Sequence, residues 1–269
     1  MLRARIITAL VLLPLVLAAI YLLPLGGFAA AFWLIVGVAA HEWAGLAGLS
    51  SRLLRAGYVL VLALLSAVVW WQPQFRAGVL IVGALFWLLA VGAVLTYPAS
   101  GRLLTRTVLV GSGWLVLLAA WTALVVVRDR AAGAHWLVWL LVLVWAADIG
   151  AYFAGRSFGR RKLAPAVSPG KTWEGAAGGA LLAALATGGA LTGAGIWSPD
   201  WFGYILALVG ISVFGDLFES VLKRHRGVKD SGTILPGHGG ALVRVDSLLA
   251  VLPFFALLML WQAGTVATG

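Results

Sequence analysis

Residues 108–127 read VLVGSGWLVLLAAWTALVVV, a run without any charged side chain. A helix needs about 20 mostly apolar residues to cross the hydrocarbon core of a bilayer, so this stretch predicts a membrane-spanning helix. The whole chain has the same character, because 62% of its 269 residues are hydrophobic and only 10% are charged. A water-soluble domain has about half of its residues apolar and about a quarter charged. A soluble globular protein is therefore excluded.

Further segments share this apolar character, and we expect an all-α, polytopic membrane protein with about nine transmembrane helices. The predicted spans are 6–23, 28–49, 53–71, 77–97, 108–127, 134–154, 173–196, 201–222 and 244–262. The first is interpreted as an anchor rather than a cleaved signal peptide, because it is long and no small-residue cleavage site follows. We expect a single integral membrane domain over 1–269, with N-terminal membrane helices in 1–130 and the C-terminal helices and cytoplasmic loops in 134–262.

The charged residues predict how the chain lies in the membrane and what it binds. The 19 Lys and Arg outnumber the nine Asp and Glu, which gives a formal net charge of +10. If the spans alternate in direction, all of these cations except Arg76, Arg128 and Arg130 fall on one side. The positive-inside rule makes that side cytoplasmic, so we expect a multi-pass protein of the inner (cytoplasmic) cell membrane. The cations favour anionic lipid or phosphorylated substrates over nucleic acid, since few polar residues remain to build a docking face.

Two connections, 155–172 and 223–243, are long and rich in Gly, Pro, Lys, Arg and Ser. The acids that fall inside the predicted spans of this half are Asp148, Glu174, Asp216, Glu219 and Asp246. An acid at the bilayer centre costs roughly 2.5–3.5 kcal/mol, so such residues usually face a polar cavity. We therefore expect a pocket that opens toward the cytoplasm. The chain has no cysteine, which excludes disulfides, thiolate metal sites and a cysteine nucleophile.

One helix face carries four polar side chains, because Asp216, Glu219, Ser220 and Lys223 follow the spacing i, i+3, i+4, i+7. A carboxylate flanked by cations is able to hold Mg²⁺ and the phosphates that the metal bridges. The simpler alternative is a salt bridge at the helix end, between Lys223 and either Asp216 or Glu219.

The second long loop combines cations with glycines, since four basic or histidine residues at 223–226 are followed by Pro-Gly-His-Gly-Gly at 236–240. Glycines let backbone N–H groups approach an anion closely, and a helix start adds partial positive charge. A basic loop that merely meets anionic lipid is the alternative, but it leaves the glycines and Asp230 unexplained. Lys171 in the earlier loop is predicted to be a phosphate-binding charge. Glu42, near an inner membrane end, is expected to cap or pair, with a catalytic role as the alternative.

Several motifs in the second half of the chain belong together. They are Ser220-Val-Leu-Lys223-Arg224, Lys229-Asp230-Ser-Gly232, Leu235-Pro236-Gly-His238-Gly239-Gly240, Arg244-Val-Asp246, Asp148-Ile-Gly-Ala-Tyr152 and Ser168-Pro-Gly-Lys171-Thr-Trp-Glu174-Gly175. This series resembles the phosphatidate cytidylyltransferase family, also called CDP-diacylglycerol synthase. The specific motifs occupy about 145–247, and the resemblance in length and number of spans covers the whole chain.

The resemblance implies a nucleotidyltransferase of phospholipid biosynthesis that makes CDP-diacylglycerol and pyrophosphate from CTP and phosphatidate. The lipid brings its own oxygen nucleophile, so no covalent enzyme intermediate is needed. The family also implies a divalent cation, Mg²⁺ or another, held by carboxylates, waters and phosphates. The expected partners are CTP, phosphatidate and membrane lipid, with no nucleic acid; a homodimer is left open.

The resemblance also implies roles for individual residues. Asp216 is expected to be the main metal ligand, supported by Asp246 and Asp148. The expected catalytic residues are Asp216, Lys223, Lys229 and Asp246. The expected substrate-binding residues are Lys171, Ser220, Arg224, Asp230, His238, Gly239, Gly240 and Arg244, among which Ser220 orients a phosphate oxygen and Asp230 binds ribose or positions a lysine.

The chain departs from the family pattern at Val243, where the family usually has an aspartate before Arg244. In the family that acid is implicated in metal binding, so the resemblance predicts one metal ligand fewer and an impaired activity. A catalytically silent lipid-binding member is therefore an alternative. A membrane transporter is another, since transporters also carry charges within their spans. A phosphatidyltransferase that consumes CDP-lipid is disfavoured, because its Asp-x-x-Asp-Gly type of motif does not occur.

Overall fold

The computed structural model describes residues 2–228, 230, 232 and 240–267, with the backbone alone for 2–10 and 263–267. Within this part of the chain, every predicted span is a helix. The helices are α1 Leu2–Leu22, α2 Leu25–Leu46, α3 Arg52–Trp71, α4 Arg76–Leu95, α5 Arg106–Arg128, α6 Gly133–Phe158, α7 Trp173–Gly193, α8 Pro199–Arg226 and α9 Leu242–Ala267. Two short 3-10 helices, η1 Pro73–Phe75 and η2 Ala99–Leu103, precede and follow α4.

Eight helices of the described part, α2 to α9, are long and apolar enough to cross a membrane. In α1 the apolar stretch with described side chains, Val11–Leu22, is shorter than a full span. The prediction of an all-α, polytopic membrane protein is therefore confirmed.

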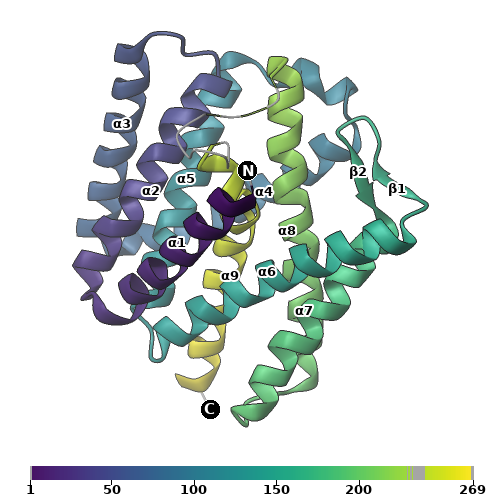
Figure 1. Ribbon diagram of the computed structural model, residues 1–269. Helices are drawn as coiled ribbons and strands as arrows, with labels where there is room; N and C mark the ends of the chain where they lie inside the picture. Colours follow the sequence, from purple (N-terminus) through teal and green to yellow (C-terminus); the bar gives the residue numbers. More distant parts are fainter. Residues whose placement is uncertain (1, 229, 231, 233–239, 268–269) are drawn as a thin grey trace.

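Helix α5 lies behind α2 in the view of Figure 1 and packs against α2, α3, α4, α6 and α9. Its sequence is free of charge between its ends. In its most apolar stretch 72% of the residues are buried, against 22% in the peripheral α3. Indole N–H groups satisfy backbone carbonyls across this core: Trp43 Nε1 donates to the Leu109 oxygen at 2.7 Å, and Trp121 Nε1 donates to the Ala29 oxygen at 3.0 Å. These bonds join α2 to α5 and give both buried indole N–H groups an acceptor in the apolar interior.

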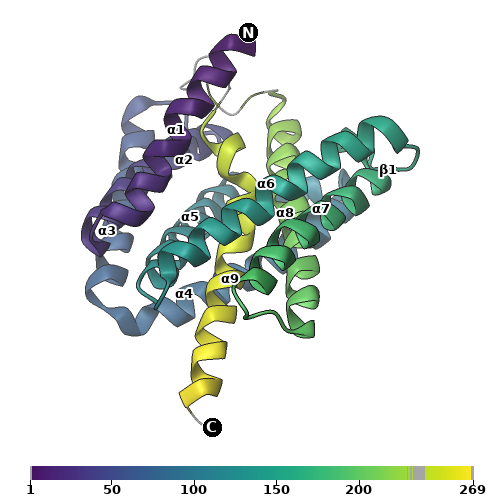
Figure 2. The ribbon, with the colours of Figure 1, turned by 60° about the horizontal axis from the view of Figure 1, so that its bottom comes forward.

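Helices α6 and α7 form a closely packed antiparallel pair that crosses α9 obliquely (Figure 2). The close approach depends on glycines. A Cβ atom added at Gly179 would lie 2.5 Å from the Ala147 oxygen, and one added at Gly150 would lie 2.5 Å from the Gly178 oxygen. Without a strong hydrophobic drive between helices in lipid, small residues that bring backbones together are a main source of attraction.

The connection between α6 and α7 contains a β-hairpin that the sequence analysis treated only as a loop. Strands β1, Lys162–Ala164, and β2, Ser168–Thr172, pair antiparallel, with Lys162 opposite Thr172. Two side chains fasten the hairpin to the start of α7. Thr172 Oγ1 accepts from the Gly175 N–H at 3.1 Å, and the Glu174 carboxylate accepts from the Arg160 and Arg161 N–H groups at 3.0 and 3.2 Å. The hairpin is thereby held over one end of the bundle.

We expect Gly179→Val to lower the stability of the protein, because the new side chain would meet the Ala147 backbone and separate α6 from α7. Overpacking of this kind costs about 1–3 kcal/mol. The matched control is Gly189→Val, also on α7, where an added Cβ would meet no atom within 4 Å. Thermal unfolding in detergent, followed by tryptophan fluorescence, measures both. Equal losses from the two variants would contradict the packing argument.

Candidate active site

A cavity of about 690 Å³ lies at the hairpin end of the bundle, lined by residues of α6, β1, β2, α7, α8 and α9. Its volume falls in the range of about 300–1,000 Å³ that is typical of small-molecule sites. The charged residues that line it are Asp148, Arg156, Lys171, Asp216, Arg244 and Asp246. Ala147, Ala151, Val209 and Val213 form an apolar part of the wall. The cavity therefore brings together six charged groups from four separate elements, α6, β2, α8 and α9.

An ion pair between Lys171 and Asp216 connects β2 to α8. The Lys171 Nζ atom lies 2.7 Å from Asp216 Oδ2 and donates to the Val213 oxygen at 3.3 Å. A lysine ammonium has three N–H donors, so among the described contacts one of them remains for another acceptor. Both side chains line the cavity and are partly exposed. The pair therefore places a cation and a carboxylate side by side where a phosphate or a metal would reach them.

Helices α8 and α9 approach closely next to Asp216, at Gly215. A Cβ atom at Gly215 would lie 2.7 Å from the backbone oxygen of Asp246, so any larger residue would push the helices apart. One turn away, Ser247 Oγ donates to the Ser212 oxygen at 3.1 Å and joins the same helices. The Asp246 side chain is buried, and its Oδ1 accepts from the Ser247 N–H at 2.6 Å. This packing puts Asp216 and Asp246 on the wall of one cavity.

The carboxylates of Asp148, Asp216 and Asp246 are the donors that Mg²⁺ prefers. Within the described residues, no three or more Asp, Glu, His or Cys side chains are grouped closely enough to hold one ion together. Magnesium sites, however, usually take only one or two carboxylates and fill the remaining positions with water and substrate phosphates. The donors of this cavity fit such a partly protein-bound ion, and the metal itself stays a prediction.

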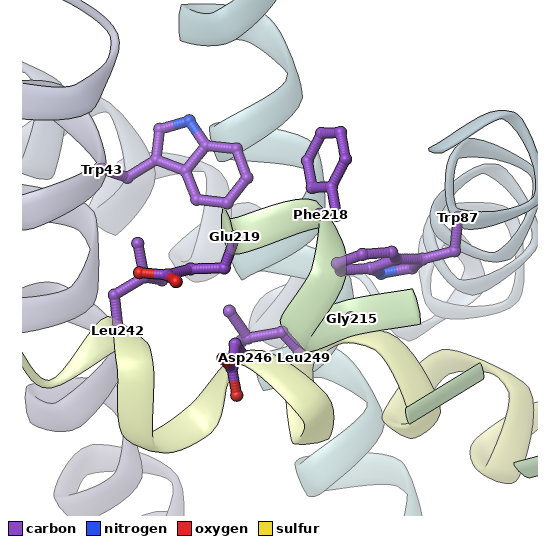
Figure 3. A pocket seen from close by; sticks show the side chains of 8 residues that line it. All are labelled: Trp43, Trp87, Gly215, Phe218, Glu219, Leu242, Asp246 and Leu249. Carbon is purple, nitrogen blue, oxygen red and sulfur yellow. The ribbon is translucent and has the colours of Figure 1, made fainter. Parts of the chain in front are cut away.

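The predicted polar face of α8 divides between two sites. Asp216 pairs with Lys171, whereas Glu219 forms an ion pair with Lys223 one turn along the helix. For Lys223 and Glu219, the simpler alternative of a helix-end salt bridge is thus the contact observed. The Glu219 side chain is 4% exposed and lines a second cavity of about 10 Å³, enough for about one water. In Figure 3 the Glu219 carboxylate lies beside Leu242, whereas the Asp246 carboxylate points away from Glu219.

The other predicted site residues that the structure describes do not line the large cavity. Ser220, Lys223, Arg224, Asp230 and Gly240 are not among the described residues that line it. The exposed Arg224 donates to the Val167 oxygen at 3.4 Å, which ties the end of α8 to the turn of the hairpin. Lys229, His238 and Gly239 lie outside the described residues. The substrate roles of all these residues stay predictions.

The contacts of Glu42 confirm the expectation that this residue caps or pairs. This carboxylate is 3% exposed on α2, and it accepts two hydrogen bonds from the start of α9: from the Ala241 N–H at 3.0 Å and from the Leu242 N–H at 2.8 Å. The first N–H groups of a helix have no partner within the helix, and a negative charge there is favourable. Glu42 therefore fixes the beginning of the helix that carries Arg244 and Asp246.

The structure also shows cavity residues to which the sequence analysis gave no role. Arg156, Tyr152 and Thr172 line the wall, and so does the half-buried Val243. In the sequence, Arg156 served only to assign the orientation of the chain in the membrane, because a lone cation near the end of a span usually has no further role. The place of Val243 shows that an aspartate there would have faced this cavity.

The fold and the cavity together define a multi-pass membrane protein with a site of carboxylates and cations at one end of its helix bundle. The chain belongs to the cytidylyltransferase family, whose sequence model matches residues 3–261. It is 46% identical to the phosphatidate cytidylyltransferase of Pseudomonas aeruginosa over 98% of both chains. It is 38% identical to that of Haemophilus influenzae, over 95% of this chain and 98% of the relative. The predicted family is therefore confirmed, and neither relative is named as a transporter.

We expect Glu42→Ala to loosen the start of α9, because two buried N–H donors would lose their acceptor. Each such loss costs about 1–3 kcal/mol. Hydrogen–deuterium exchange should become faster in the peptide that contains Ala241 and Leu242. The control is Ser51→Ala, which removes the cap of α3, where Ser51 Oγ accepts from the Leu54 N–H at 3.1 Å. Unchanged exchange at α9 in the Glu42 variant would show that this cap is dispensable.

Proposed function

We propose that the protein transfers the cytidylyl group of CTP to phosphatidate, giving CDP-diacylglycerol and pyrophosphate, at the cytoplasmic face of the inner membrane. The observation that carries this proposal is the shared cavity of Lys171, Asp216, Arg244 and Asp246, in a chain of the cytidylyltransferase family. The excess of cations at the loops of this end supports the cytoplasmic placement. CTP is a cytosolic nucleotide, and the lipid reaches the cavity from the bilayer.

In the reaction, an oxygen of the lipid phosphate forms a bond to the α-phosphorus of CTP. The bond from that phosphorus to the oxygen bridging to the β-phosphate breaks, and this oxygen leaves with the pyrophosphate. Lys171 and Arg244 would neutralise the phosphates that meet in the cavity and hold them in position. A divalent cation held by Asp216 and Asp246, with Asp148 in support, would supply further positive charge for the developing pyrophosphate.

The acidic wall explains why cations are needed. Asp148, Asp216 and Asp246 line the same cavity and would repel two polyanionic substrates if nothing neutralised them. Lys171 balances one of them directly through its ion pair with Asp216. The apolar residues Val209 and Val213 line the same space, which suits a lipid substrate with its glycerol and acyl chains.

We expect Asp216→Asn to lower pyrophosphate release at least about 100-fold, because the loss of several kcal/mol of charge stabilisation costs a factor of ten for about every 1.4 kcal/mol. Asparagine keeps the shape of the side chain but removes both the ion-pair partner of Lys171 and a carboxylate ligand. The assay contains purified protein, CTP, Mg²⁺ and phosphatidate in detergent. Asp200→Asn, at the exposed start of α8, is the matched control. Retained turnover in Asp216→Asn would remove this residue from the mechanism.

We expect Val243→Asp to raise the turnover of the chain, because it adds a carboxylate to the cavity wall beside Asp246. The same pyrophosphate assay compares the variant with the unsubstituted chain, and their thermal unfolding shows that both are folded. Activity in the variant alone would support both the enzyme assignment and a metal role for this position. No activity in either of two folded proteins would contradict the proposed reaction and favour a catalytically silent lipid-binding protein.

A further inference from the structure

Arg156 is a charged residue of the large cavity that the chemistry above does not use. It lies two residues before the end of α6, is exposed, and lines the cavity wall. Its Nη1 atom donates to the Tyr152 hydroxyl at 2.9 Å. Among the described residues its guanidinium forms no ion pair with a carboxylate, whereas Lys171 is paired with Asp216. Arg156 therefore brings to the cavity a positive charge that no described acid balances.

The surroundings of Arg156 place it where the cavity meets the lipid-facing surface. Ile149, Tyr152, Phe153 and Arg156 follow the spacing i, i+3, i+4, i+7 and share one face of α6. The first three are 51%, 58% and 64% exposed, and in a membrane protein such an apolar face lies against acyl chains. Arginine and tyrosine near a helix end reach toward the headgroup level of the bilayer. Both Tyr152 and Arg156 also line the cavity, so they stand at its border with lipid.

Arg156 is separated along α6 from Asp148, one of the acids of the cavity. Asp148 lies eight residues earlier on α6, which corresponds to about 12 Å along a helix at 1.5 Å per residue. Asp148, Asp216 and Asp246 favour a metal-bound polyanion, whereas a free phosphomonoester is repelled by them and attracted by an unbalanced guanidinium. A guanidinium also binds phosphate oxygens in pairs, which fixes the orientation of the phosphate.

We propose that Arg156, together with the Tyr152 hydroxyl, binds the phosphomonoester headgroup of the lipid substrate at the lipid-facing border of the cavity. The inference rests on the proposed function and assigns the two substrates to different parts of one cavity: the lipid phosphate to α6, and the nucleotide to the wall around Lys171 and Asp216. The simpler alternative is that Arg156 only complements the partial negative charge at the end of α6.

The experiment measures binding instead of turnover, so it does not depend on how active the chain is. Dissociation constants are measured on the full chain in neutral detergent, separately for dioctanoyl phosphatidate, dioctanoylglycerol and CTP with Mg²⁺. In Arg156→Gln we expect binding of phosphatidate to weaken about tenfold or more, the loss of about 1.4 kcal/mol that one charged contact supplies. Binding of CTP should stay within about twofold, and Arg156→Lys should recover part of the loss because the charge is kept.

The matched control is Arg160→Gln, an exposed cation just beyond the same helix that does not line the cavity. Equal weakening of phosphatidate and CTP in Arg156→Gln would overturn the assignment to the lipid, and so would an equal loss in Arg160→Gln, which indicates diffuse attraction only. Unchanged phosphatidate binding would leave Arg156 with its helix-end role. If the unsubstituted chain binds no phosphatidate at all, the proposed function fails first, before the assignment of Arg156.

Discussion

The ion pair between Lys171 and Asp216 is the contact on which the candidate site depends. It joins a strand outside the bundle to a membrane-spanning helix, and it places both charges on the wall of one cavity. A carboxylate within a span is costly unless a cation or N–H donors face it. The hairpin supplies that cation, and the caps formed by Thr172 and Glu174 hold the hairpin in place. The hairpin between α6 and α7 is thus part of the charge balance of the bundle.

The acids of the bundle other than Asp216 differ in whether a group of the protein balances their charge. Glu219 forms an ion pair with Lys223, and Glu42 accepts two N–H bonds from the start of α9, so each has a partner within the protein. Asp148 and Asp246 face the large cavity and form no ion pair among the described residues. Acids that remain unbalanced at this depth are the ones expected to bind ligands. This reasoning favours Asp148 and Asp246 over Glu219 as functional carboxylates.

Local sequence predicted the helices well, because a span needs only length and apolarity, and these are properties of one segment. The helical spacing also predicted a salt bridge of Lys223 as an alternative. The hairpin was missed because its strands are short and held mainly by caps from α7. The partner of Lys171 was missed for a different reason: it lies 45 positions along the chain, on α8, and nothing in either segment encodes their register. Arg156 was recognised as a charged residue, but its place on the cavity wall depends on how α6 packs in the bundle, and the local sequence does not encode that.

The hydrogen bonds of Glu42 show how the N-terminal helices support the candidate site, although the recognisable motifs lie in about 145–247. The start of α9 is buried at Ala241 and Leu242, and its free N–H groups have to find acceptors inside the bundle. The acceptor comes from α2, about 200 positions earlier in the chain. Trp43, the next residue, donates to α5 and so holds this turn of α2 against that helix. The position of Asp246 is therefore set partly by helices that carry none of the motifs, which agrees with a family match over residues 3–261.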